Sequence, residues 1–205
     1  MSLKIREFRD EDMPGVCKAF VEGFASRIKT VRRLNRYDPD VIEGLVGLFI
    51  ESGDLSIVAE SDGKARGILV GEFTGDLLSV DTQLFMTRFI STLLKISDHR
   101  TISSLLDGFM YVLQFSKYYG SVPSVLLLTS QKDFRGGIGT KLMDRWIEEI
   151  EKEGYDSTIV GTDERLAWRF YEGYGFERDT VFELRPRLFS EPSEKIDGYI
   201  YRYDV

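Results

Sequence analysis

Residues 122–140 read VPSVLLLTSQKDFRGGIGT, and this stretch decides the fold. It begins with an apolar run rich in Val and Leu, Val122–Thr129, which is typical of a central strand covered on both faces. Three glycines follow within four residues, at Gly136, Gly137 and Gly139, and a helix-forming segment comes next. Glycines let the chain turn sharply and bring its backbone close to a ligand. The order strand, glycine-rich turn, helix therefore predicts a cradle of backbone N–H groups that suits a phosphate or pyrophosphate.

The glycine pattern differs from two common nucleotide-binding loops. It contains neither Gly-x-x-x-x-Gly-Lys-Ser/Thr nor Gly-x-Gly-x-x-Gly, which are typical of nucleoside triphosphatases and of dinucleotide-binding domains. It also comes late in the chain, whereas a dinucleotide loop follows the first strand of its unit. The expected ligand is therefore another phosphate-bearing cofactor.

On both sides of this stretch the chain alternates between short strands and amphipathic helices. Asp62-Gly63 lies at the centre of a predicted hairpin, and the rhythm breaks at about residues 76–120, where two amphipathic helices joined by the polar link Ser97–Arg100 are expected. We expect one domain over residues 1–205, of α/β (α+β) class, with a mixed sheet flanked by helices and a helical insertion between the third and fourth strands. The predicted strands are Lys4–Phe8, Leu55–Glu60, Ala65–Thr74, Val122–Thr129, Ser157–Val160, Thr180–Leu184 and Tyr199–Tyr203. The apolar stripes of the predicted helices run over Val16–Phe24, Val41–Ile50, Phe85–Ile96, Ile102–Leu113 and Leu142–Ile150, and a short helix is predicted at Glu164–Glu172. The second of these helices is expected to begin at Pro39, after Asp38, and to end at Gly53.

The composition limits the classes of function. The 205 residues are 42% apolar and 30% charged, which is typical of a globular protein. The net charge is −7, whereas a nucleic-acid-binding protein usually carries a basic face, so no nucleic-acid partner is expected. No apolar run approaches the roughly 20 residues of a membrane span, and no export signal is visible. The single cysteine, Cys17, cannot close an intramolecular disulfide, so a cytoplasmic protein is expected.

A second motif follows the glycines. Residues 167–177 read AWRFYEGYGFE. The two segments together resemble the coenzyme A pyrophosphate loop, approximately Arg/Gln-x-x-Gly-x-Gly/Ala, and the later Ala-x-x-Phe-Tyr-x-x-x-Gly-Phe segment of the GCN5-related N-acetyltransferase (GNAT) superfamily. Gly137 and Gly139 match the first segment, and Ala167 and Tyr171 match the second. The resemblance covers nearly the whole chain except the insertion.

The sequence departs from the family pattern at three places. The family's Arg/Gln position falls on Phe134, and Arg135 lies one place later. Glu164 stands where the family often has an asparagine. The central strand has no acid in Val125–Leu128, although many members of the family carry a glutamate there as general base.

The resemblance implies acetyl transfer from a thioester to an amine, by direct attack through a tetrahedral intermediate. Tyr171 matches the tyrosine that protonates the departing thiolate, and a backbone N–H near Leu128 or Thr129 would hold the oxyanion. Glu72 is the candidate general base, with Glu60, Asp76 or a chain of water molecules as alternatives. The cofactor-binding residues that the resemblance implies are Leu128, Thr129, Phe134, Arg135, Gly136, Gly137, Ile138, Gly139, Thr140, Glu164, Ala167 and Tyr171.

The prediction is an enzyme that moves the acetyl group from acetyl-CoA to a primary amine of a small molecule or peptide, with no metal and no membrane partner. Two alternatives stay open. A non-catalytic coenzyme A-binding regulatory module is one, because the central strand lacks an acid. An acyltransferase with a longer acyl-CoA is the other, because inserted apolar helices could line a wider pocket. The inserted helices could also form a homodimer contact.

Overall fold

The computed structural model describes residues 3–25, 31, 39–73, 99–119, 122–134, 137–185 and 195–205. Within these residues seven strands form one mixed sheet, in the order β1-β2-β3-β4-β5-β7-β6. β4 and β5 run parallel, and the other neighbouring pairs described are antiparallel. The strands are β1 (Lys4–Glu7), β2 (Leu55–Ser61), β3 (Lys64–Glu72), β4 (Ser124–Ser130), β5 (Ser157–Asp163), β6 (Glu177–Leu184) and β7 (Ile196–Asp204).

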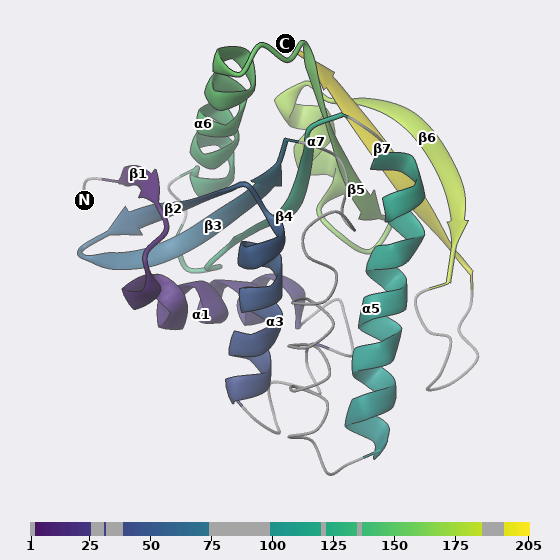
Figure 1. The fold of residues 1–205 in the computed structure, drawn as a ribbon, viewed down its shortest axis with the longest axis horizontal. Helices are drawn as coiled ribbons and strands as arrows, with labels where there is room; N and C mark the ends of the chain where they lie inside the picture. The colour runs from purple at the N-terminus through teal and green to yellow at the C-terminus, as the bar shows by residue number, and fades with distance from the viewer. Residues whose placement is uncertain are drawn as a thin grey trace.

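Helices cover both faces of the sheet (Figure 1). α1, α3 and α5 lie on one face, and α6 lies on the other. The helices are the short 3-10 helix η1 (Asp10–Asp12), α1 (Met13–Phe24), α3 (Pro39–Ser52), α5 (His99–Tyr119), α6 (Ile138–Lys152) and α7 (Trp168–Tyr174).

α6 packs on its face of the sheet through one apolar side. Leu142, Trp146 and Ile150 recur at helical spacing and are fully buried. The Trp146 indole N–H donates to the hydroxyl of Thr158 in β5 at 3.0 Å. Gly71 of β3 makes room for the ring, because a Cβ at this position would lie 2.2 Å from it. A buried tryptophan with a satisfied N–H thus fixes α6 above the centre of the sheet.

The opposite face is covered by three helices in one layer. Val16 of α1 and Val46 of α3 are fully buried in the same cluster. Phe115 of α5 packs edge-on against Phe182 of β6, with 5.3 Å between the ring centroids. Leu126 of β4 packs against both groups, which joins them into a continuous apolar layer.

The fold class predicted from the sequence is confirmed: the sheet is mixed, helices flank it, and α5 enters the chain between β3 and β4. α5 covers the predicted helix Ile102–Leu113 and begins at His99, inside the expected polar link. The other inserted helix, predicted at Phe85–Ile96, lies outside the described residues, as does the candidate base Asp76.

The short helix predicted at Glu164–Glu172 begins later, at Trp168, and the residues before it form a turn. Asp163 explains the delay. Its carboxylate accepts the backbone N–H of Arg165 at 2.7 Å, and its carbonyl accepts the N–H of Leu166 at 3.1 Å. An aspartate that bonds the backbone just after it favours a turn over a helix.

Other boundaries differ from the prediction too, since β5 ends later, at Asp163, and β7 begins earlier, at Ile196. β4 begins at Ser124 rather than Val122, since Pro123 has no N–H to donate to a neighbouring strand. β6 begins earlier than predicted, at Glu177. It is an edge strand whose first residues are exposed, so the expected alternation of apolar residues is missing there.

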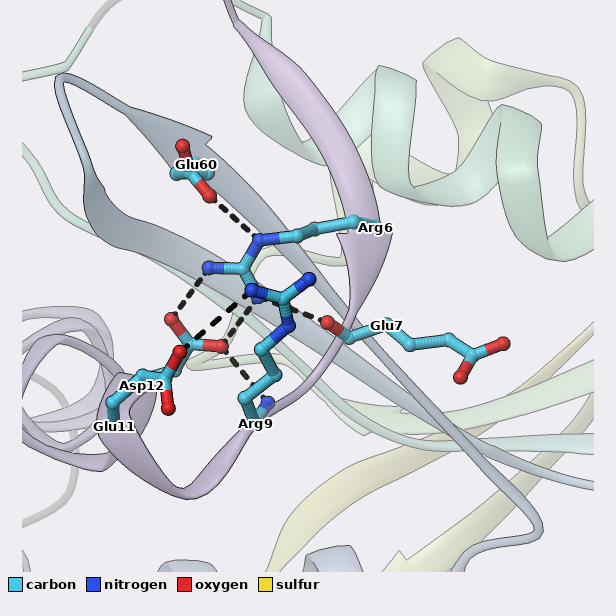
Figure 2. Close-up of polar contacts among 6 residues, drawn as sticks. All are labelled: Arg6, Glu7, Arg9, Glu11, Asp12 and Glu60. Atoms are coloured by element: carbon cyan, nitrogen blue, oxygen red, sulfur yellow. Dashed lines mark hydrogen bonds and ion pairs between the residues drawn. The ribbon is translucent and has the colours of Figure 1, made fainter.

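An ion-pair network joins the N-terminal strand to the first helical turn (Figure 2). The Arg6 guanidinium donates two hydrogen bonds to Asp12, at 2.6 and 2.8 Å, and a third to Glu60 of β2 at 2.6 Å. Asp12 also accepts the backbone N–H of Arg9 at 2.9 Å, and its side chain is only 4% exposed. Hydrogen bonds from Arg6 hold the pKa of Asp12 below its usual value.

We expect Asp12→Asn to lower the free energy of unfolding by about 2 kcal/mol at pH 7, because it leaves a largely buried Arg6 with one of its carboxylate partners missing. The pKa of Asp12 is lower in the folded than in the unfolded chain. Its stabilisation is therefore present at neutral pH and is lost as the pH falls below about 4, through the folded pKa. Urea unfolding should show the wild-type advantage at pH 7 and a smaller one at pH 3. Glu11→Gln, which removes only an exposed pair with Arg9, is the control and should change neither value.

Candidate active site

β4 and β5 part soon after they meet. Their register consists of two pairs, Ser124 with Ile159 and Val125 with Val160. β4 then continues to Ser130 beside β3, and β5 continues beside β7. Beyond Val125, the two central strands therefore have backbone edges that do not pair with each other.

A β-bulge in β4 lies where the strands part. Val70 of β3 pairs with Leu127 and Gly71 pairs with Val125, so Leu126 is an extra residue in β4. Leu126 and Leu127 consequently pack on the same face of the sheet, under α1 and α3, and Leu128 returns to the face under α6. A bulge bends its strand and increases the local twist. This accounts for the departure of β4 from β5.

The turn after β4 is anchored by one buried glutamine. The Gln131 N–H donates to the carbonyl of Arg66 at 2.8 Å, and its side-chain amide donates to the carbonyls of Gly15 and Ala65 at 3.1 Å each. Two residues earlier, the Thr129 hydroxyl donates to the carbonyl of Ala19 in α1 at 2.8 Å. The end of β4 is thus held to α1 and β3.

The first turn of α6 presents backbone N–H groups. Gly137 has a φ of 67°, a left-handed conformation that favours glycine, and α6 begins at the next residue. The Lys141 N–H donates to the Gly137 carbonyl at 3.1 Å, which is the first bond of the helix. The N–H groups of Ile138, Gly139 and Thr140 precede that bond, so they have no intrahelical acceptor. Arg135 and Gly136, predicted to complete this loop, lie outside the described residues.

The structure brings the two sequence motifs into contact. A Cβ at Gly139 would lie 3.1 Å from the ring of Phe170 in α7, so the glycine lets α7 approach the first turn of α6. The Tyr174 hydroxyl donates to Asp144 of α6 at 2.8 Å and holds the same two helices together. Tyr174 therefore has a packing role in this arrangement. Phe134, at the end of the turn, packs against the buried apolar cluster under α6, as Phe170 does.

Solved structures match this arrangement over the full length of the chain, whereas no protein-family model and no curated protein matches its sequence significantly. A proposed acetyltransferase of Salmonella typhimurium, solved with its cofactor acetyl-CoA, aligns with a TM-score of 0.58 at 16% identity and covers 100% of this chain and 94% of that one. A proposed acetyltransferase of the GNAT family from Desulfovibrio desulfuricans aligns with a TM-score of 0.56 at 13% identity and covers 99% of each chain. The chain has the GNAT fold. Arylalkylamine N-acetyltransferase 2 of Aedes aegypti shares it, with a TM-score of 0.58 at 16% identity over 100% of this chain and 99% of that one.

Tyr171 is buried in this GNAT fold. Its side chain is 8% exposed, and its ring packs against Phe176 and Tyr201. Burial raises the pKa of the Tyr171 phenol above its usual value of about 10, so the hydroxyl is protonated at neutral pH. Ala167 and Glu164, which precede α7, are both exposed.

The carboxylates proposed as general base lie in different places. Glu72 is the last residue of β3, is fully buried, and pairs in register with Ser124, next to the point where β4 and β5 part. Glu60 lies two strands away from β4 and is bonded to Arg6. Among the described candidates, Glu72 is therefore the one near the parting strands.

Sequence reasoning missed a buried cluster at the end of β5. The Asp163 carboxylate is fully buried and accepts hydrogen bonds from the Tyr111 hydroxyl at 2.9 Å and from the Arg165 guanidinium at 2.5 Å. Tyr111 belongs to α5, so this cluster ties the turn before α7 to the inserted helix. The adjacent acids Asp163 and Glu164 were visible in the sequence, but no local pattern indicates a partner so distant along the chain.

Two further observations concern metal ions and membranes. Among the residues that the structure describes, no group of three or more His, Cys, Asp or Glu side chains could hold a metal ion. No helix within the described ranges is both long enough and apolar enough to cross a membrane.

Proposed function

We propose that this chain is an acetyl-CoA-dependent N-acetyltransferase that acts on a primary amine of a small molecule or peptide. The observation that carries the proposal is the parting of β4 and β5 at the bulge of Leu126, with the N–H-bearing first turn of α6 following the same strand. The Salmonella typhimurium protein with the same fold was solved with acetyl-CoA, which supports this cofactor.

The residues present could bind coenzyme A through backbone N–H groups, with no need for a pocket of basic side chains. The N–H groups of Ile138, Gly139 and Thr140 would receive the pyrophosphate, because they lack intrahelical acceptors and lie at the positive end of the α6 dipole. The backbone of Leu128 and Thr129, beyond the last pair with β5, would hold the pantetheine arm. Backbone donors allow a chain of net charge −7 to bind an anionic cofactor.

The proposed chemistry assigns separate protons to separate residues. Glu72 takes the proton of the amine, whose nitrogen attacks the thioester carbonyl. A backbone N–H near Leu128 or Thr129 stabilises the oxyanion. Tyr171 gives its proton to the departing thiolate, and its protonated state at neutral pH suits this role.

Thermal denaturation with and without acetyl-CoA tests the cofactor. At 100 times its Kd, acetyl-CoA stabilises a single site by about 2.7 kcal/mol, which corresponds to a rise in Tm of roughly 5–10 °C for a domain of this size. NADH and ATP are the controls and should produce no comparable rise. The absence of stabilisation by any acyl-CoA would contradict the proposal.

Release of free thiol from acetyl-CoA tests the transfer. Tryptamine, spermidine and a tetrapeptide with a free N-terminus serve as acceptors, and we expect at least one of them to accelerate release over water. Stabilisation without thiol release from any acyl-CoA would instead identify a coenzyme A-binding module. Faster release from butyryl-CoA than from acetyl-CoA would identify an enzyme for longer acyl groups.

A further inference from the structure

The proposed cofactor site has a direction along β4. Coenzyme A is a linear molecule in which the pyrophosphate, the pantetheine arm, the thioester and the acyl group follow one another. With the pyrophosphate at the first turn of α6 and the arm along Thr129 and Leu128, the acyl group points back along β4 toward the bulge at Leu126. The bulge directly follows the last pair of β4 with β5, Val125 with Val160. The acyl end of the cofactor is therefore expected where the two strands part.

Two aromatic side chains of α5 meet β5 at this place. Gly161 is the first residue of β5 after its last pair with β4. A Cβ at Gly161 would lie 2.6 Å from the Tyr119 hydroxyl and 2.6 Å from the ring of Phe115, so both side chains lie directly against the backbone of β5. Tyr119 and Phe115 are both buried. Any residue larger than glycine would have to displace them, so the Tyr119 hydroxyl lies against the strand at the parting point.

The bulge connects the same aromatic side chains to β4. Leu126, the extra residue of β4, packs against the buried cluster to which Tyr119 and Phe115 belong. The ring of Phe115 is held edge-on by Phe182 of β6, with 5.3 Å between the centroids. On the face under α5, apolar side chains thus connect β4 and β5 where their backbones separate. Buried rings that are close-packed in this way leave little room for an additional group.

We propose that Tyr119 is a specificity-determining residue whose phenol forms the end wall of the acyl site and restricts the donor to short acyl groups such as acetyl. The inference rests on the proposed function and names the donor class of the same site. Inserted helices could line a wider pocket, but the end of α5 fills the space beside the acyl group instead. A longer acyl chain would have to displace the phenol, and discrimination by about 10–200-fold for each methylene is typical of an apolar site.

Calorimetric titration with acetyl-CoA, butyryl-CoA and free coenzyme A tests this wall without any acceptor. For the wild-type protein we expect acetyl-CoA to bind about tenfold more tightly than butyryl-CoA, or better. Tyr119→Leu shortens the side chain and keeps it apolar, so butyryl-CoA should gain about tenfold in affinity relative to acetyl-CoA. Tyr119→Phe removes only the hydroxyl that contacts Gly161 and should shift the ratio in the same direction by a smaller factor. Free coenzyme A has no acyl group and should bind all variants equally.

Tyr118→Leu is the matched control for Tyr119→Leu. Tyr118 is the neighbouring residue of α5, but its ring packs against Phe182, with 4.5 Å between the centroids. The same loss of aromatic surface there should leave the ratio of the two dissociation constants at its wild-type value. If Tyr119→Leu does not fold, Tyr119→Phe decides the question.

Three results would overturn the inference: equal affinity of the wild-type protein for both donors, a wild-type ratio in the folded Tyr119 variants, or an equal shift in Tyr118→Leu. In each of these cases the proposed function stands, because acetyl-CoA is still bound. Failure of the wild-type protein to bind any of the three ligands would refute the proposed function itself, and the end wall with it.

Discussion

Tyr171→Phe is expected to lower kcat at least 100-fold while the Kd for acetyl-CoA changes less than twofold. The substitution keeps the ring that packs against Phe176 and Tyr201 and removes only the hydroxyl. Loss of a positioned general acid costs typically about 10²–10⁴-fold in rate. The cofactor is proposed to be held by backbone groups of β4 and α6, which this substitution leaves in place. Steady-state thiol release and calorimetric titration with acetyl-CoA measure the two quantities.

Tyr174→Phe is the matched control for this experiment. It lies on the same short helix and loses a hydroxyl whose partner is Asp144 of α6, at 2.8 Å. We expect it to retain kcat within threefold. If Tyr171→Phe lost cofactor binding together with activity, Tyr171 would have a structural role and the assignment of the general acid would be wrong.

Thr140→Asp is expected to weaken acetyl-CoA binding on the order of 100-fold while slightly stabilising the protein without ligand. Thr140 is exposed in the first turn of α6. A carboxylate there interacts favourably with the helix dipole, by about 0.3–1 kcal/mol. The same charge would stand close to the proposed pyrophosphate, and repulsion from two phosphate charges about 4 Å away costs about 2 kcal/mol even at the dielectric of bulk water, and more at a protein surface. Opposite effects on stability and on binding are the signature of a phosphate site at this turn.

Thr140→Asn separates charge from shape. It is nearly the same size as aspartate and carries no charge, so its Kd for acetyl-CoA should stay within a few-fold of the wild-type value. Calorimetric titration gives the Kd, and denaturation without ligand gives the stability. Equal weakening by Asn and Asp would mean that the side chain blocks the site sterically, and unchanged binding in both would place the phosphates elsewhere.

Much of the architecture follows from local patterns in the sequence. The hairpin of β2 and β3 was predicted from two β-type runs around Asp62-Gly63, and α6 from its apolar side at helical spacing. Asp62 and Gly63 both have positive φ, as a tight hairpin turn requires. These features depend on neighbours in the chain, which is why they can be predicted without a structure.

The geometry of the site depends instead on contacts between distant segments. The run Val125–Leu128 is apolar throughout, so its residues carry no sign of the bulge at Leu126 that turns Leu126 and Leu127 to the same face. The contact between Gly139 and Phe170 joins two motifs that were predicted separately. The sequence identifies both motifs, but it does not show that the missing side chain of Gly139 makes room for the ring of Phe170.

Tyr119 shows the same limit more strongly. Its place near the end of an inserted helix predicts only packing. Its contact with Gly161 follows from the order of the strands in the sheet and from the point where β4 and β5 part. The candidate base Glu72 was identified from the hairpin alone, and its full burial at the register of Ser124 became apparent only in the structure.

The central claim is that coenzyme A binds at the first turn of α6 and along β4 beyond its last pair with β5. Amide chemical shifts recorded by NMR while acetyl-CoA is added test this claim most directly. The account predicts the largest changes at Ile138, Gly139 and Thr140 and at Leu128 and Thr129, with small changes at the Arg6–Asp12 network on the far edge of the sheet. Changes that leave the start of α6 and the end of β4 unaffected, or no changes at all, would contradict it.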